Sequence, residues 1–232
     1  MTDQQLSPTP RTTITRHRER GATDRAALFE ILDEALICHV GLVRDGAPVV
    51  LPSIHAADTE GPDEGGTLYL HGSVAAPWIA GADATDVCVT VTLVDGIVAA
   101  RAAFNHSMNY RSAVVFGRAR KVTDDAERAH ALGLVVDHVI PGRSETLRAN
   151  TRKELAATGL LAVPLAEASV KVRSGGPKDD DSDIEAGVWA GVIPLHQGAG
   201  AVEPDADHEV PADITDVVRR RAAAWGAPDT DR

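Results

Sequence analysis

Short strand-like segments joined by hairpin-type turns recur along this chain and restrict the folds open to it. Residues Ile37–Val43 and Pro48–Ala56 flank an Asp45-Gly46 turn, and Val87–Thr92 alternates apolar and polar residues. Further strands are expected over Thr67–Leu70, Gly96–Ala103, Ala113–Val122, Leu160–Arg173 and Gly187–Pro194. Because alternating βαβ units are absent, this order predicts a mainly β fold, a barrel-like sheet with peripheral helices.

The helical segments are few and lie between or after the strands. Thr23 is positioned to cap a helix that contains Leu28, Ile31 and Leu32 at helical spacing. Helices are also expected over Asp124–Ile140 and Thr151–Thr158. We therefore predict an N-terminal arm over residues 1–22, one domain over 23–197, and an acidic tail with a short helix over 198–232.

The formal charge of −11 is concentrated in one segment. Residues 178–216 hold one lysine and eleven carboxylates, a formal charge of −10, which leaves −1 for the rest of the chain. A nearly neutral body argues against nucleic acid as a partner, because binding to it depends on basic side chains. No apolar run is long enough for a membrane span or a signal peptide, and two cysteines without CxxC spacing suit a reducing compartment, so we expect a soluble, cytoplasmic protein.

Polar side chains crowd the residues Phe104–Gly117, before a run of β-branched residues. An arginine fork and neighbouring hydroxyls can share one phosphate dianion, which makes Tyr110, Arg111 and Ser112 candidate ligands. Leu68–Ser73 ends another strand in the same way, with His71 and Ser73 at its end and a glycine that would let a ligand approach the backbone. The two polar strand ends indicate a bound phosphorylated ligand.

Alternative sites have weaker support. His39, His55, His71 and His106 lack the spacing of a helical metal site, so we predict no metal, although a barrel could still assemble them around a structural metal or a haem. No serine lies in a G-x-S-x-G motif, and there is no G-x-G-x-x-G or P-loop. Trp189 lies between small residues and either packs in the core or covers a planar ring. Lys171 and Arg173 share a strand face that either meets solvent or forms an anion site.

The order of these motifs resembles that of the pyridoxamine 5′-phosphate oxidase-like proteins, and within them the flavin-nucleotide-binding branch that includes nitroimidazole resistance proteins. The likeness covers residues 12–197 and depends on four sequence segments that follow one another in the same order. They are VVLPS (49–53), YLHGS (69–73), YRSAVVFG (110–117) and WAG (189–191).

The resemblance implies a split β-barrel, a homodimer, and FMN in a groove between the subunits. It places Leu51, Pro52, Ser53 and Ile54 beside the flavin ring, and Arg111 and Ser112, with Tyr110, at the phosphate. The remaining implied FMN contacts are Tyr69, His71, Gly72, Ser73 and, from the partner chain, Trp189.

The resemblance also predicts a function. We expect an FMN-dependent oxidoreductase of a small-molecule substrate, with His71 as a proton donor. The alternative is a non-catalytic protein that binds or senses a flavin, a deazaflavin or haem. Ser73-Val74-Ala75 stands where pyridoxamine phosphate oxidases have a Ser-Arg-Lys type cluster, which argues against the vitamin B6 reaction.

Overall fold

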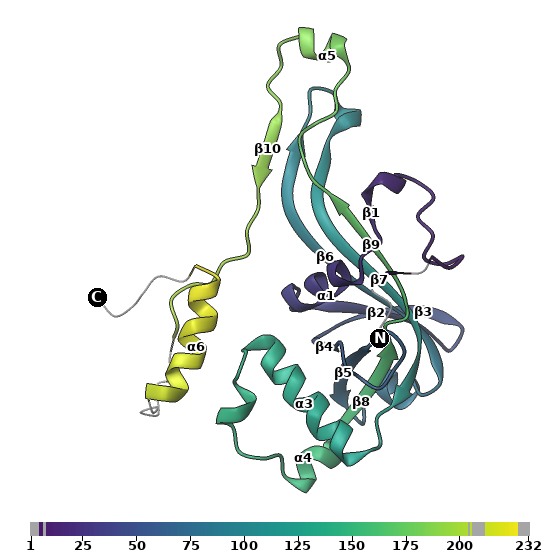
Figure 1. Cartoon of the computed structure of the whole chain (residues 1–232), viewed down its shortest axis with the longest axis vertical. Helices are drawn as coiled ribbons and strands as arrows, with labels where there is room; N and C mark the ends of the chain where they lie inside the picture. The colour runs from purple at the N-terminus through teal and green to yellow at the C-terminus, as the bar shows by residue number, and fades with distance from the viewer. Residues whose placement is uncertain (1–4, 7, 204, 206–211, 227–232) are drawn as a thin grey trace.

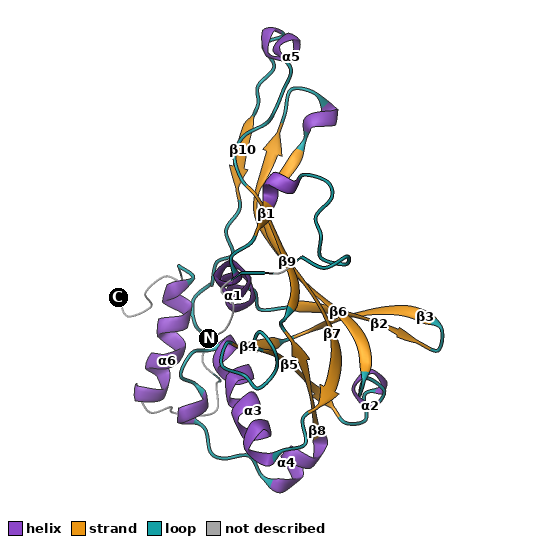
Figure 2. Cartoon of the chain, turned by 45° about the vertical axis from the view of Figure 1, so that its right-hand side comes forward, coloured by secondary structure: helices purple, strands orange, loops and turns teal. Residues whose placement is uncertain are grey.

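Antiparallel strands dominate the computed structural model of the chain, which describes residues 5–6, 8–203, 205 and 212–226 (Figures 1 and 2). Parts of the predicted N-terminal segment (residues 1–22) and of the predicted acidic tail (residues 198–232) lie outside these residues. The strands are β1 (Gly21–Ala22), β2 (Cys38–Arg44), β3 (Ala47–Ser53), β4 (His55–Asp58), β5 (Thr67–Ser73), β6 (Thr85–Ala99), β7 (Ser107–Lys121), β8 (Thr158–Pro164), β9 (Glu167–Arg173) and β10 (Gly191–Pro194). The helices are α1 (Arg25–Glu34), α2 (Pro77–Ala80), α3 (Asp125–Val139), α4 (Arg152–Ala157), α5 (Asp181–Glu185) and α6 (Ala212–Ala224).

The main sheet runs in the order β3-β2-β6-β7-β8-β5-β4, with β9 on β7, β1 on β9 and β10 on β6. It curves without closing, so the predicted mainly β split barrel with peripheral helices is confirmed. The two longest strands, β6 and β7, pair along nearly their whole length and extend beyond the barrel as an arm (Figure 1). We use "the arm" below for the part of this hairpin from Val94 to Tyr110 together with β10.

The predicted turn at Asp45-Gly46 is present, with φ of 52° and 78° at the two residues, as a tight hairpin requires. Several predicted boundaries were wrong. The segment Gly96–Ala103, predicted either to continue the strand Val87–Thr92 or to return beside it, continues it as far as Ala99, where β6 ends, with an irregularity between Val94 and Gly96. The predicted strands Pro48–Ala56 and Leu160–Arg173 each divide into two.

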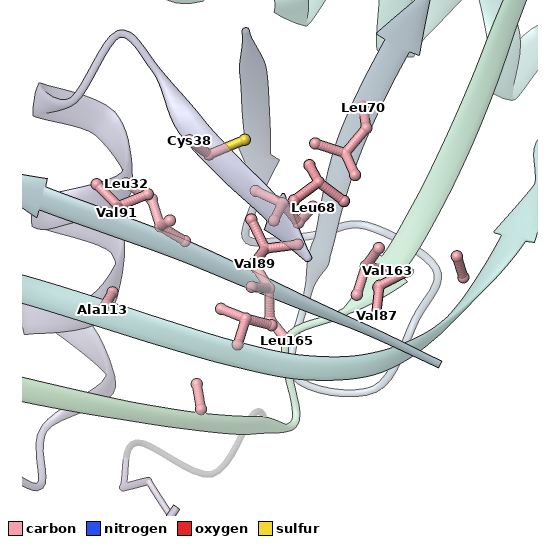
Figure 3. Close-up of a cluster of buried hydrophobic side chains, with 14 of the residues drawn as sticks. Leu32, Cys38, Leu68, Leu70, Val87, Val89, Val91, Ala113, Val163 and Leu165 are labelled. Atoms are coloured by element: carbon pink, nitrogen blue, oxygen red, sulfur yellow. The ribbon is translucent and has the colours of Figure 1, made fainter. Parts of the chain in front are cut away.

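The barrel core is apolar and lies between the curved sheet and α1 (Figure 3). Leu28, Ile31 and Leu32 of α1 are the helical positions that the sequence predicts to be apolar, and all are buried. Asp24, one residue after the predicted cap, accepts from the backbone N–H of Ala26 and begins the helix. In the described residues we find no helix with the length and apolar character of a membrane span.

Candidate functional site

The strand β3 carries the first predicted ligand segment at an edge of the sheet. Among the described residues it pairs only with β2, so its other side offers backbone groups to a further partner. Pro52, which has no N–H to donate, is exposed there, while Leu51 and Ser53 are half-buried. The Ser53 hydroxyl donates to the carbonyl oxygen of Ile54 at 2.9 Å. This edge is a suitable place for a ligand that bonds to backbone groups.

The second predicted segment, at the end of β5, lies next to the first. His55 pairs with Leu70, so one step along the register Ile54 lies opposite His71. His71 is half-buried, and its Nδ1 atom is buried without a hydrogen-bond partner in the described residues. Burial lowers the pKa of His71, so the imidazole is neutral at pH 7. A buried ring nitrogen without a hydrogen-bond partner lowers the stability of the fold. A ligand bound beside His71 could supply the missing hydrogen bond.

Tyr69 does not lie at this rim. Its side chain is fully buried on the α3 side of the sheet, where its hydroxyl donates to Glu127 at 3.1 Å. Burial and the neighbouring carboxylate raise the pKa of Tyr69. The predicted contact between Tyr69 and a flavin therefore has no support from its side chain, and the residue connects β5 to α3.

Gly72 has a different role from the one the sequence indicates. A Cβ atom at this position would lie 3.1 Å from Ile79 and 3.3 Å from Trp78, both in α2. The glycine therefore makes room for the helix and not for a ligand. Ser73 is exposed, and its hydroxyl accepts from the N–H of Ala75 at 3.2 Å, which shapes the turn before α2.

Arg111 is engaged by two carboxylates. Its Nε and Nη2 atoms donate to Asp95 at 2.8–3.3 Å, and Nη1 and Nη2 donate to Glu34 at the end of α1. These partners raise the pKa of Arg111. A phosphate would have to displace one of them, because both compete for the same N–H donors. Phosphate binding by Arg111 stays a prediction under that condition.

Arg111 and His71 do not lie side by side. Ser53 of β3 pairs with Cys38 of β2, and one step beyond the pairing of His39 with Thr90 this places Cys38 opposite Val91 of β6, which pairs with Ala113 of β7. The β3–β5 rim and the Arg111 end of β7 are therefore three strands apart, about 15 Å at the usual spacing of strands. A ligand would have to span that distance to contact both residues.

Tyr110 and Ser112 point away from Arg111. Ala113 and Val115 are buried in the barrel core, so alternation along β7 places Tyr110 and Ser112 on the opposite face. They pair there with Arg173 and Lys171 of β9, and the Ser112 hydroxyl donates to the carbonyl oxygen of Lys171 at 3.4 Å. The predicted phosphate cluster is therefore divided between two faces of the sheet.

Trp189 lies just before β10 and is 68% exposed. Its indole lies against Gly191, where a Cβ atom would be only 3.0 Å from the ring. Of the two alternatives for Trp189, packing in the core of its own chain does not hold, and covering a planar ring stays a prediction.

The four histidines considered for a metal or haem do not converge. His39 and His106 are exposed, His71 is half-buried, and His55 is fully buried beside α1. The described residues contain no group of three or more His, Cys, Asp or Glu side chains able to hold a metal ion.

Sequence reasoning missed several of the partners that define these positions. Glu34 and Asp95 lie 77 and 16 residues from Arg111 in the sequence, and no local motif links them. Strict alternation along Tyr110-Arg111-Ser112 was the one signal that could have separated the arginine from its neighbours.

The open antiparallel barrel with helices on its outside defines a recognised structural class. The profile of the pyridoxamine 5′-phosphate oxidase family matches residues 24–172. The chain therefore belongs to the pyridoxamine 5′-phosphate oxidase family. No curated protein sequence matches it.

Two solved structures resemble the chain over nearly its whole length. The flavocytochrome Anf3 from Azotobacter vinelandii is 37% identical with a TM-score of 0.81, and the match covers 91% of this chain and 98% of that one. The FAD and haem binding protein from Mycobacterium smegmatis is 39% identical with a TM-score of 0.79, covering 88% and 97%. A candidate 5-nitroimidazole resistance protein from Bacteroides thetaiotaomicron, at 23% identity, TM-score 0.51 and coverage of 66% and 86%, shows the fold alone.

Proposed function

We propose that this protein binds a flavin nucleotide and acts as a flavin-dependent oxidoreductase on a small molecule. The observation that carries the proposal is the similarity, at 37% and 39% identity along almost the entire chain, to a flavocytochrome and to an FAD and haem binding protein. FMN is our first assignment from the sequence. FAD is the alternative, since one of these proteins binds it.

The rim formed by β3 and β5 fits the polar edge of a flavin. Backbone groups of Leu51–Ile54 lie along a sheet edge, and the Nδ1 atom of His71 is buried next to them without a partner. A flavin ring offers both donors and acceptors, which backbone groups and one imidazole nitrogen can satisfy. When bound, the flavin supplies hydride or single-electron chemistry, and the protein binds and orients it.

The chemistry of His71 follows from its burial. Because its pKa is lowered, the imidazole is neutral at pH 7 and offers one N–H donor and one acceptor nitrogen. It would orient a bound ring or substrate at neutral pH. A role as an imidazolium proton donor belongs to more acidic solutions.

We further propose that the protein is a homodimer. Trp189 is exposed just before β10, which pairs with residues 96–99 of β6, whereas β2, the neighbour of β3, pairs with residues 88–90 of that strand. The indole therefore lies far along the sheet from the β3–β5 rim and could cover a ring only at a partner's rim. The exposed apolar side chains of the arm provide a surface for such a partner. Those above 35% exposure are Val94, Ile97, Phe104 and Met108 in the hairpin and Ile193 in β10.

The absorption spectrum of the purified protein tests the flavin proposal. We expect bands in the flavin region, before or after addition of FMN or FAD, and release of the bound cofactor identifies which nucleotide it is. Bleaching by NAD(P)H or another reductant supports an oxidoreductase, and a flavin that binds without being reduced supports storage or sensing. A colourless protein that ignores both nucleotides contradicts the proposal.

Haem is a second candidate cofactor, because both full-length relatives carry haem-related descriptions. A neutral imidazole is the form that ligates iron, and burial keeps His71 in that form. A Soret band that disappears in His71→Ala but persists in His106→Ala would support ligation by His71. His39, exposed on β2, is the next variant to compare.

A further inference from the structure

A polar strip lies on the outer face of β7 and β9. In the register of these strands Ser112 pairs with Lys171 and Tyr110 with Arg173. Val170 is buried and Val172 packs against the barrel core, so alternation directs Lys171 and Arg173 to the other face. Two cations and two hydroxyl groups are therefore neighbours on one surface.

Neither cation has an acidic partner. Arg173 is only 8% exposed, and its guanidinium donates to the Asn109 side chain and to the carbonyl oxygens of Gly175 at 3.4 Å and Gly176 at 3.3 Å. The Nζ atom of Lys171 donates to the carbonyl oxygen of Arg16 at 3.3 Å. Within the described part of the chain, no carboxylate lies within 4 Å of either side chain. A buried guanidinium bonded mainly through long contacts to neutral oxygens is poorly compensated.

Three other arginines in or beside the sheet have carboxylate partners. Arg101 pairs with Asp179, Arg111 with two carboxylates and Arg120 with another two. The one carboxylate on the same face of β9, that of Glu167, forms an ion pair with Arg11. Arg173 therefore differs from these arginines in having no carboxylate partner among the described residues.

A third cation adds to the strip. Gly21 pairs with Lys171, which places the preceding residue, Arg20, at this end of β9. Arg20 is one-fifth exposed, and its acidic contact is Glu19 at 3.8 Å, a carboxylate that also meets His17. Burial, and then the positive charge of Arg20, lower the pKa of Arg173. The two guanidinium groups therefore repel each other, and a bound anion would relieve that repulsion.

We propose that Lys171 and Arg173, with the hydroxyls of Tyr110 and Ser112, bind a phosphate group on the outer face of β7 and β9. A phosphate dianion accepts several N–H and O–H donors at once, which matches this set. The phosphate could belong to a flavin nucleotide, in which case the site rests on the proposed function, or to a separate phosphate ester. Arg111, on the other face, takes no part.

Calorimetric titration with inorganic phosphate and with pyrophosphate tests the site at low ionic strength. Lys171→Ala is the main variant because Lys171 is half-buried and its loss leaves the core intact, and Lys153→Ala, an exposed lysine of α4, is the matched control. We expect Lys171→Ala to weaken pyrophosphate binding roughly tenfold, the size of one charge-assisted hydrogen bond. Lys153→Ala should bind like the wild type. Arg173→Gln should abolish binding, and circular dichroism shows whether that variant is folded.

Riboflavin and FMN distinguish the two sources of phosphate. If the flavin tail occupies the site, the wild type prefers FMN to riboflavin and Lys171→Ala loses that preference. Phosphate binding without any flavin binding would support the site and reject the proposed function. A wild type that binds FMN but neither phosphate nor pyrophosphate, or an equal loss in Lys153→Ala, would overturn the site and leave the flavin proposal standing.

Discussion

Gly72 shows how the absence of one side chain positions a helix beside the predicted site. Ile79 and Trp78 of α2 occupy the space that a Cβ atom would need, and Gly159, paired with Gly72, meets Ile79 in the same way. Two facing glycines thus let α2 approach the ends of β5 and β8. The short helix has four residues, so this packing and not its own hydrogen bonds must hold it.

We expect Gly72→Ala to destabilise the protein by about 1–3 kcal/mol, the usual cost of overpacking. Urea denaturation measures the change. Gly200→Ala is the control, because nothing lies within 4 Å of its Cβ position and its φ is not positive. Equal stabilities of the two variants would contradict the packing role.

Two buried histidines join α1, β4 and α3. The Nε2 atom of His55 bonds to the carbonyl oxygen of Leu32 at 2.9 Å, and that of His138 to the carbonyl oxygen of Ala35 at 2.9 Å. The two rings lie 4.7 Å apart. Burial, and then the neighbouring His138, lower the pKa of His55 to about 4 from an ordinary 6.5. Both rings are therefore neutral in the folded protein at pH 7.

This pair makes stability depend on pH. Between pH 6.5 and 4 the unfolded chain binds a proton at His55 that the folded protein does not, so the free energy of unfolding falls as the pH is lowered. We expect a loss of about 2 kcal/mol between pH 6.5 and 5, before most carboxylates titrate. Urea denaturation across this range should show a smaller slope for His55→Gln. An unchanged slope would mean that other groups cause the dependence.

At the scale of elements, a charge network fastens α3 to the sheet. Arg120 of β7 donates to Asp63, in the loop before β5, at 2.7 and 2.9 Å, and to Glu127 of α3 at 2.6 and 3.1 Å. Glu127 also accepts from the hydroxyl of Tyr69. The Asp63 and Glu127 side chains are 13% and 17% exposed. One arginine therefore compensates two largely buried carboxylates from different segments.

Arg120→Ala would leave both carboxylates without their cation, and we expect a loss of stability of about 2–3 kcal/mol. Arg148→Ala removes a comparable pair with Glu154 on the surface, 68% and 45% exposed, and should lower the stability much less than Arg120→Ala does. Chemical denaturation of the two variants gives the comparison. Similar losses would show that burial of the network contributes little.

At the scale of the whole molecule, the arm is the part of the sheet that does not pack against the barrel core of its own chain. It extends away from the core (Figure 2). It carries apolar side chains into solvent, and Phe104, in the turn between β6 and β7, is 95% exposed. Extended apolar surface of this kind is typical of an interface. A dimer would also bring the Trp189 of one chain within reach of the other chain's β3–β5 rim.

Light scattering should therefore give a mass twice that of the 24.4 kDa chain. We expect Trp189→Ala to remain dimeric and to bind flavin roughly tenfold more weakly, because an aromatic ring over the flavin is lost. Trp225→Ala is the control, since its indole stacks on Arg221 in the C-terminal helix. A monomer, or full flavin affinity in Trp189→Ala, would contradict this arrangement.

Local pattern was sufficient to predict much of this protein. Alternation and turn residues predict the hairpin at Asp45-Gly46 and the strands on either side, and helical spacing identifies the buried face of α1, because these signals act between close neighbours in the sequence. The mainly β fold could therefore be inferred from the sequence alone.

Tertiary structure alone decided which charges meet. Arg111 meets Glu34 and Asp95 because α1 packs against β6 and β7, while Lys171 and Arg173 have no carboxylate partner on the opposite face. His55 meets His138 from a distant helix. Such pairings depend on how whole elements pack across the core, so the residues next to each side chain in the sequence do not indicate its partner.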